Sequence, residues 1–405
     1  MKSISYLLII ITVAGYVSCS KGDKKDGNHD NNNNEDTLPY APDKFCMGAD
    51  LSYVNQVEDH GGVYSDSGKV ADPFHIIRNH GANLVRVRLW HQPVWIRDVY
   101  GDPDMQLYSD LFDVERTIRR AKENGMVVNL DIHYSDFWAD PGRQNPPAAW
   151  KDITQLSVLK DSVYRYTFRI LKYYNDKGLM PEMVQVGNET NCGMLMTGLN
   201  AGFPDLNCCN GQWDNLGQVI NEAIRAIREV DEVSTVNTQI VLHVADPKNM
   251  EWWFDNIRSK GGVTDFDVVG FSYYPLWHTT VPFDDLSMLV ATVAEKYQKK
   301  VMIMETGYPW TTANADNYGN IQGGQSPLTG FPFTQQGQYD FLVSLTQKII
   351  TAGGHGVIYW EPAWITSQMK DSWGTGSSYD NCTLFDFSGN TIMGINFMNY
   401  KYQFP

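Results

Sequence analysis

Two glutamates in this sequence each follow a run of apolar residues. Glu305 ends the run that starts at Val301, and Glu189 ends the segment that starts at Met183. Such runs indicate buried strands, beside which an unpaired carboxylate is strongly unfavourable. Two carboxylates that face one another across a barrel mouth can hydrolyse a glycosidic bond with retention of configuration. We therefore predict that Glu189 is the acid/base and Glu305 the nucleophile of a retaining glycosidase.

The two roles need different proton affinities. The acid must stay protonated, so burial and the charge of Glu305 must raise the pKa of Glu189. An arginine near Glu305 would keep the nucleophile ionised, and we predict that Arg88 is this arginine. Asn188 is adjacent to the acid and is expected to donate to the sugar 2-hydroxyl, a contact that strengthens in the transition state.

Other polar and aromatic residues stand near the ends of the predicted strands. A structural ion pair with an arginine is favoured for Glu361, and a hydrogen-bonded core position for His243. Either Tyr273 or Tyr274 is expected to bind the nucleophile, and the pattern does not choose between them. Trp360 is expected at the cleavage subsite. The predicted substrate-binding residues are Asp50, Arg88, His133, Asp136, Trp138, Asn188, Tyr273, Tyr274, Trp360 and Trp364.

Eight strand-like segments must position these side chains. They are residues 45–50, 84–90, 127–131, 183–187, 239–245, 268–273, 301–305 and 356–360. Helical patterns with recognisable ends lie between them, such as one that starts at Asp72 and Pro73 and one that stops at Gly125. Strands and helices that alternate in this number predict a (β/α)8 TIM barrel in a single domain. A doubly wound parallel sheet is the structural alternative.

Composition and the N-terminus indicate an exported protein. The chain has 32 basic and 47 acidic residues and a net charge of −15, which disfavours nucleic acid and anionic membranes as partners.

Residues 1–19 resemble a lipoprotein-type signal peptide in which Cys19 becomes the lipidated residue. Residues 20–40 are predicted to form a disordered polar tether, and residues 41–405 the catalytic domain. We expect a monomer held by a lipid at the bacterial outer membrane or cell surface, with secretion as the alternative.

The remaining cysteines cannot be paired from the sequence. They are Cys46, Cys192, Cys208, Cys209 and Cys382. Their spacing matches no zinc pattern, and their odd number leaves at least one thiol outside any internal disulfide. The connectivity therefore stays open.

Seven motifs in barrel order resemble one glycosidase family. They are GADLSYV (48–54), VRVRLW (85–90), DIHYSD (131–136), WADP (138–141), QVGNETN (185–191), ETGYP (305–309) and YWEPAW (359–364). Together they resemble glycoside hydrolase family 53 of clan A. The resemblance implies an arabinogalactan endo-β-1,4-galactanase that cuts the galactan side chains of pectin, binds galacto-oligosaccharides and needs no cofactor for its chemistry. After Asn191 the chain departs from the family pattern at Cys192 and Met196, which leaves the number of subsites open.

The same resemblance implies a structural calcium ion between the loops that follow the last two strands. Carboxylate, amide and carbonyl oxygens are the ligands that Ca²⁺ prefers. The expected side-chain ligands are Asn314, Asp316, Asn320 and Asp380, and the expected carbonyl ligands are those of Tyr318 and Ser377. Because Asn and Asp also form ordinary turns, loops without a metal are the alternative.

Two other functions stay open. Another clan A endo-β-1,4-glycanase would act on mannan, xylan or glucan, and activity on a panel of linear polysaccharides separates it from a galactanase. A surface glycan-binding protein would keep the barrel without catalysis, although a pure binder has no need of two facing acids.

Overall fold

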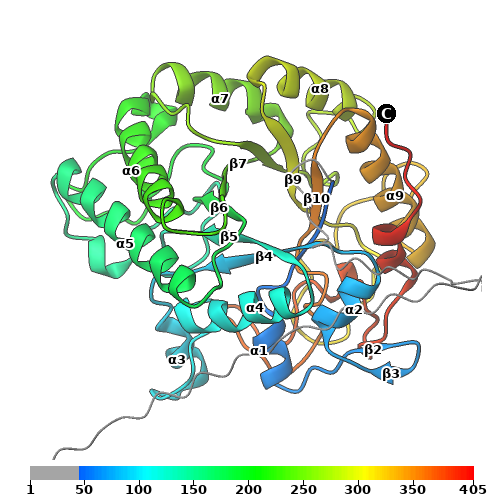
Figure 1. Ribbon diagram of the computed structural model, residues 1–405. Helices are drawn as coiled ribbons and strands as arrows, with labels where there is room; N and C mark the ends of the chain where they lie inside the picture. The colour runs from blue at the N-terminus through cyan, green and yellow to red at the C-terminus, as the bar shows by residue number, and fades with distance from the viewer. Residues whose placement is uncertain (1–44) are drawn as a thin grey trace, which may run out of the picture. The chain divides into compact units, whose positions relative to one another are not determined.

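The computed structural model describes residues 45–405, and eight parallel strands of this part close into a barrel (Figure 1). The strands are β1 (Cys46–Asp50), β4 (Leu84–Leu89), β5 (Val127–Ile132), β6 (Met183–Val186), β7 (Gln239–Ala245), β8 (Val268–Ser272), β9 (Lys300–Thr306) and β10 (Gly356–Tyr359). Strand β1 pairs with both β10 and β4, so the sheet has no edge. The prediction of a (β/α)8 barrel is confirmed, and closure excludes the doubly wound alternative.

Helices cover the outside of the strands, as Figure 1 shows for α4 to α9. The helices are α1 (Val54–Asp59), α2 (Pro73–Asn79), α3 (Trp95–Tyr100), α4 (Leu111–Glu123), α5 (Leu156–Asp176), α6 (Trp213–Asp231), α7 (Met250–Ser259), α8 (Leu286–Tyr297) and α9 (Gln335–Thr351). Side chains cap several of them: Asp72 accepts a hydrogen bond from the Phe74 N–H, and Asp110 accepts from the N–H groups of Phe112 and Asp113. The capping predicted at Asp72 and Pro73 is therefore confirmed.

Small elements fill the connections. A two-stranded hairpin, β2 (Ser65–Asp66) with β3 (Lys69–Val70), precedes α2. Short 3-10 helices are η1 (Ala148–Trp150), η2 (Cys208–Asn210), η3 (Pro247–Asn249), η4 (Asp380–Cys382) and η5 (Met393–Asn399). The hairpin, α1 and α3 were not predicted because each is too short to show a period in the sequence.

The barrel interior is apolar at one end and polar at the other. A cluster of nine buried side chains fills the N-terminal part of the strands, and it consists of Cys46, Leu84, Val127, Met183, Val241, Val268, Met302, Met304 and Ile358. Two residues further along the same inward faces, the side chains are Arg86 on β4, Asn129 on β5, Gln185 on β6 and His243 on β7. The chemistry is therefore gathered at the C-terminal end of the barrel, as barrels of this type place it.

Strand β9 is irregular just before its functional end. Alternation from the interior-facing Met304 would turn Glu305 outward toward the helices. The register shifts here against both neighbours: on β8, Phe271 pairs with Ile303, but the next residue, Ser272, pairs with Glu305. A bulge of this kind lets two successive side chains face the same side of the sheet. It brings Glu305 into the barrel mouth.

The predicted signal segment 1–19, with Cys19, and the predicted tether 20–40 lie outside the described residues. Export, lipid attachment and the monomeric state stay predictions. Among residues 45–405, no helix combines the length and the apolarity that crossing a membrane requires.

Candidate active site

The two glutamates meet in one cavity of about 650 Å³. Glu189 follows β6 and Glu305 lies in β9, and both are largely buried, with 9% and 6% of their surface exposed. One carboxylate oxygen of Glu189 lies within 4.8 Å of one of Glu305. This separation is shorter than the roughly 6.5–9.5 Å between the carboxyl groups of inverting glycosidases and matches the closer spacing of retaining ones.

The backbone after β6 turns sharply to present Glu189. Gly187 and Glu189 both have positive φ angles, of 78° and 46°. A side chain at Gly187 would also place its Cβ 2.7 Å from Thr190, so glycine is needed there. Hydrogen bonds from the N–H and the hydroxyl of Thr190 to the carbonyl of His243 hold the turn. A glutamate rarely adopts this conformation, and the surrounding contacts enforce it.

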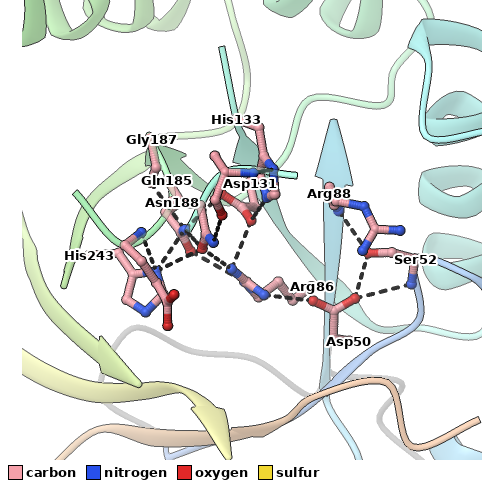
Figure 2. A network of polar contacts seen from close by, with 12 residues as sticks. Asp50, Ser52, Arg86, Arg88, Asp131, His133, Gln185, Gly187, Asn188 and His243 are labelled. Carbon is pink, nitrogen blue, oxygen red and sulfur yellow. Dashed lines mark hydrogen bonds and ion pairs between the residues drawn. The ribbon is translucent and has the colours of Figure 1, made fainter. Parts of the chain in front are cut away.

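Arg86 is the arginine that contacts Glu305. Its Nη1 lies 2.9 Å from Oε1 of Glu305 and 2.7 Å from Oδ2 of Asp50, and its Nη2 lies 2.7 Å from Oδ2 of Asp131. Figure 2 shows this guanidinium between Asp50 on one side and Asp131 and Asn188 on the other. The prediction that Arg88 supports Glu305 is therefore wrong. Arg86 and Arg88 share one face of β4, and sequence alone cannot say which of them is level with Glu305.

Arg88 belongs to a different ion pair behind the cavity wall. Its Nη1 lies 3.2 Å from Oε1 of Glu361, and both side chains are almost completely buried. This confirms the ion pair predicted for Glu361. The guanidinium carbon also lies 4.0 Å from the ring centre of Trp138 and 4.5 Å from those of Tyr53 and Trp90. Arg88 thus supports a cavity-lining tryptophan through cation–π contacts.

The electrostatic environment separates the proton affinities of the two glutamates. Burial raises the pKa of Glu189 well above its usual value, and the charge of Glu305 raises it further. Burial also raises the pKa of Glu305, but the charge of Arg86 opposes that rise. Tyr274 Oη donates a 3.0 Å hydrogen bond to Oε2 of Glu305. Glu305 is accordingly the carboxyl group that ionises first, and Glu189 the one that keeps its proton.

The choice between the two tyrosines follows from strand alternation. Ser272 and Tyr274 share the inward face of β8 and its extension, whereas Tyr273 faces the other way. Tyr274 lines the cavity and contacts Glu305. Tyr273 is buried outside the cavity lining, so it does not take the predicted substrate-binding position.

Three more predicted substrate-binding residues lie behind the cavity lining. Asp50 binds Arg86 and accepts a hydrogen bond from Ser52, and His133 Nε2 lies 2.9 Å from Oδ2 of Asp131. Asp136 accepts hydrogen bonds from backbone N–H groups at positions 92 and 148 and so joins two loops. These side chains, like Arg88, position other groups and do not face the cavity.

Tryptophans form much of the cavity wall. Trp138, Trp360 and Trp364 line it, as predicted from their places after strand ends. Trp277 and Trp373 also line it and are 41% and 54% exposed. Neither of these two was predicted: Trp373 lies 14 residues past β10, whereas Trp277 follows β8 as closely as Trp138 follows β5 and could have been singled out by the same reasoning.

The predicted calcium ligands gather where the loops after β9 and β10 meet. Thr366 Oγ1 lies 2.8 Å from Asp316 Oδ2 and 3.0 Å from Asp380 Oδ2, so the two carboxylates are neighbours. Within residues 45–405 neither forms an ion pair with a basic residue, and burial together with the charge of Asp316 raises the pKa of Asp380. Asn320 donates to Asp380, and its own Oδ1 is buried without a hydrogen-bond partner in the described part of the chain. A cation would satisfy these oxygens, so the residues fit Ca²⁺.

The other predicted ligands surround the same carboxylates. The Ser377 N–H donates to Asp316 Oδ2, and the Tyr318 N–H donates to Asp316 Oδ1. Asn314 Nδ2 donates to the carbonyl of Tyr318 at 2.8 Å. Several oxygens predicted to bind the ion thus accept hydrogen bonds from backbone N–H groups or from Asn314. Metal binding would replace some of these hydrogen bonds by coordination to the ion.

A disulfide closes the loop that follows the acid. Cys192 is bonded to Cys209, which answers the pairing that the sequence left open. Cys208 and Cys382 are buried thiols. The bridge lies in the segment after Asn191, where the chain departs from the family motif.

Comparison with known proteins agrees with this geometry. The model of glycosyl hydrolase family 53 matches residues 46–398. An arabinogalactan endo-beta-1,4-galactanase of Cellvibrio japonicus is 41% identical over 363 residues, which cover 89% of this chain and 92% of that protein. An endo-beta-1,4-galactanase of Bacillus subtilis is 33% identical over 394 residues, covering 88% and 86% of the two chains. The solved Ignisphaera aggregans GH53 catalytic domain has a TM-score of 0.77 at 31% identity and covers 90% of this chain and 98% of its own.

Proposed function

Because the chain belongs to glycosyl hydrolase family 53, we propose that it is an endo-β-1,4-galactanase that cleaves with retention of configuration. The observation that carries the mechanism is the approach of Glu189 and Glu305 to within 4.8 Å in one cavity. At this distance one carboxylate can attack the anomeric carbon while the other handles the proton. The substrate follows from the names of the relatives in Cellvibrio japonicus and Bacillus subtilis.

In the first step the glycosidic bond breaks and an ester to the protein forms. The ionised Glu305 attacks the anomeric carbon, and Glu189 gives its proton to the departing glycosidic oxygen. Arg86 and Tyr274 hold the attacking carboxylate in place. Asn188 lines the cavity and uses one N–H to bind the carbonyl of Ala139, which leaves its second N–H for the sugar 2-hydroxyl.

In the second step water releases the sugar. Glu189, now a carboxylate, takes a proton from a water molecule, and the resulting hydroxide attacks the anomeric carbon. The bond to Glu305 breaks, which restores both glutamates to their first state. The loss of the negative charge on Glu305 in the intermediate lowers the pKa of Glu189, which favours its change from acid to base.

The cavity suits a neutral sugar polymer. Trp138, Trp360 and Trp364 offer flat apolar faces on which sugar rings can stack. The net charge of −15 disfavours a polyanionic ligand. We therefore assign the neutral galactan side chains of pectin as substrate, with galacto-oligosaccharides as products.

Hydrolysis of linear polysaccharides tests this assignment. We expect release of oligosaccharides from β-1,4-galactan and much slower release from β-1,4-mannan, xylan or glucan. Proton NMR of the first product should show the β-anomer. Equal activity on mannan or xylan would support another endo-glycanase of the same clan, and an α-product would rule out retention.

Two variants test the catalytic pair. Glu305→Gln keeps the size of the nucleophile but removes its charge, and should abolish hydrolysis while galactan binding persists. Glu189→Gln should lose activity on galactan and keep kcat/KM on substrates whose leaving group needs no proton. Its kcat on those substrates should fall, because no base then activates water in the second step. Full activity of Glu305→Gln would refute the mechanism, and binding without hydrolysis in the wild-type protein would support the glycan-binding alternative.

For the loops after β9 and β10 we propose calcium binding at Asp316, Asp380 and Asn320. The neighbouring carboxylates and the buried amide oxygen support this assignment. When bound, the ion would act structurally by neutralising the two carboxylates. Trp364, which lines the cavity, donates from Nε1 to the carbonyl of Gly376, the residue before the predicted ligand Ser377. An ion that orders this loop would therefore also help to hold Trp364 in the cavity wall.

A further inference from the structure

One buried hydroxyl group contacts the acid directly. Ser272, the last residue of β8, donates a 2.5 Å hydrogen bond from Oγ to Oε1 of Glu189. The serine is completely buried, so no water competes for this contact. Within residues 45–405, Oε2 of Glu189 accepts no hydrogen bond. The two oxygens of this carboxyl group therefore differ: one is bound to the protein, and the other is left for the cavity.

His243 lies behind this serine. Its Nε2 is 3.0 Å from Ser272 Oγ, and the ring is completely buried. Burial, reinforced by the positive charge of Arg86, lowers the pKa of His243 well below its usual value, so the ring is neutral and carries one proton. Ser272 Oγ can thus either accept from Nε2–H or donate to a bare Nε2, depending on which nitrogen carries that proton.

The surroundings of Nδ1 decide between the two tautomers. Two donors face it: Nε2 of Gln185 at 3.1 Å and the backbone N–H of Glu189 at 3.4 Å. The one oxygen nearby, Oδ1 of Asn188 at 3.0 Å, already accepts from the charged Nη2 of Arg86 at 2.8 Å. Figure 2 shows His243 beside Gln185 and Asn188. Nδ1 is therefore the acceptor, and Nε2–H donates to Ser272 Oγ.

This assignment fixes where the hydroxyl hydrogen of Ser272 points. Because Oγ accepts from His243, its single hydrogen is directed to Oε1 of Glu189. An Oε1 that accepts this bond does not carry the acidic proton. We propose that Ser272, oriented by His243, is a positioning residue that keeps the catalytic proton of Glu189 on Oε2 and stabilises the carboxylate after that proton leaves. This inference rests on the proposed role of Glu189 as acid/base.

The hydrogen bond also moderates the proton affinity of the acid. Burial and the charge of Glu305 raise the pKa of Glu189, whereas the bond from Ser272 lowers it. The other charged groups that act on Glu189 are Asp140, which raises its pKa, and Arg86, which lowers it. Removing the Ser272 hydroxyl would therefore raise the pKa of Glu189 further. The alkaline limb of kcat/KM, which reports loss of the acidic proton, should move to higher pH.

Aryl β-1,4-galactobiosides with different leaving groups test this role in Ser272→Ala. A phenyl leaving group needs protonation by Glu189, whereas a dinitrophenyl leaving group departs without it. We expect kcat/KM for the phenyl substrate and for galactan to fall about tenfold, and kcat/KM for the dinitrophenyl substrate to stay near the wild-type value. The alkaline limb should shift upward by about one pH unit.

The control variants separate positioning from packing. Ser272→Thr restores the hydroxyl and should recover activity on the phenyl substrate. His243→Gln keeps an N–H donor for Ser272 and should retain more activity than His243→Leu, and this pair carries the same test if Ser272→Ala does not fold. Glu189→Ala, which lacks the acid altogether, serves as the reference: kcat/KM should fall strongly for the phenyl substrate and little for the dinitrophenyl substrate.

Equal losses on both aryl substrates, or an unmoved alkaline limb, would overturn this inference and leave the galactanase assignment intact. A wild-type protein inactive on every galactan-derived substrate would overturn both.

Discussion

Replacing Arg86 by methionine should impair ionisation of Glu305, the proposed nucleophile, whereas the same replacement at Arg88 should not. The two residues are a matched pair, because both lie on the inward face of β4 and each side chain is 2% exposed. Among residues 45–405, Arg86 forms ion pairs with three carboxylates, including Glu305, whereas Arg88 forms an ion pair with one carboxylate, that of Glu361. The two variants therefore remove the same kind of group with different electrostatic consequences.

The size of the effect follows from the contacts. An arginine beside a carboxylate lowers its pKa by about 1–3 units, so Arg86→Met should raise the pKa of Glu305 by a similar amount. The acidic limb of kcat/KM, which reports ionisation of the nucleophile, should move to higher pH by the same interval. At a fixed pH on that limb, kcat/KM falls about tenfold for each unit of the shift. Arg88→Met should leave the limb in place and raise KM through the loss of its contact with Trp138.

Stability should fall in both variants, by about 3–5 kcal/mol, because each leaves a buried carboxylate without its partner. The stability lost in Arg86→Met should also depend on pH. Burial alone would raise the pKa of Asp131, but Arg86 and His133 outweigh it and lower that pKa. A lowered pKa contributes stability above the unfolded pKa and loses it as the pH falls through the folded value. The stability lost in Arg86→Met should thus be largest near neutral pH and shrink toward acid pH.

The assay is the pH dependence of kcat/KM on an aryl galactobioside, combined with urea denaturation at several pH values. Arg86→Lys serves as an intermediate, since its single ammonium keeps the charge but cannot bridge the carboxylates as the planar guanidinium does. An acidic limb that moves equally in the Arg86 and Arg88 variants would refute the assignment of Arg86 to the nucleophile.

Three further predictions concern the surroundings of the site. Chelation with EDTA should lower the Tm of the wild-type protein but not that of Asp316→Asn. A wild-type Tm that EDTA leaves unchanged would refute the proposed calcium site. Trp360→Ala should lower kcat/KM on galactan about tenfold through loss of sugar stacking, and should also lower the Tm, because Trp360 is 9% exposed and packs against Trp138 and Trp364. An unchanged kcat/KM in the folded variant would exclude Trp360 from substrate binding. Replacing Cys192 and Cys209 by serine should reduce the free energy of unfolding by about 3 kcal/mol, as expected for a disulfide that spans 17 positions. Urea denaturation measures this loss, and a reductant should lower the stability of the wild-type protein but not that of the variant.

Much of the fold could be predicted because its strands are continuous apolar runs and its helices have a clear period and recognisable ends. The bounds of all eight predicted strands lie within one residue of the observed ones, and the seven motifs led to the family that the comparison then showed. The choice between Arg86 and Arg88 could not be predicted, since both satisfy the same alternation and only the stagger of the closed barrel sets which one is level with Glu305. The disulfide was equally hidden, because pairing depends on how the loop after β6 folds and not on cysteine spacing.

Local rules fail most clearly at the two glutamates themselves, and the failures share a cause. Alternation on β9 would turn Glu305 away from the cavity, and a bulge reverses it. The backbone at Glu189 has a φ of 46°, which an ordinary loop would give to glycine or asparagine. Each departure is held by neighbouring strands and by hydrogen bonds to buried groups. Both departures bring a carboxylate toward the other against their mutual repulsion, which is the arrangement that two-step hydrolysis needs.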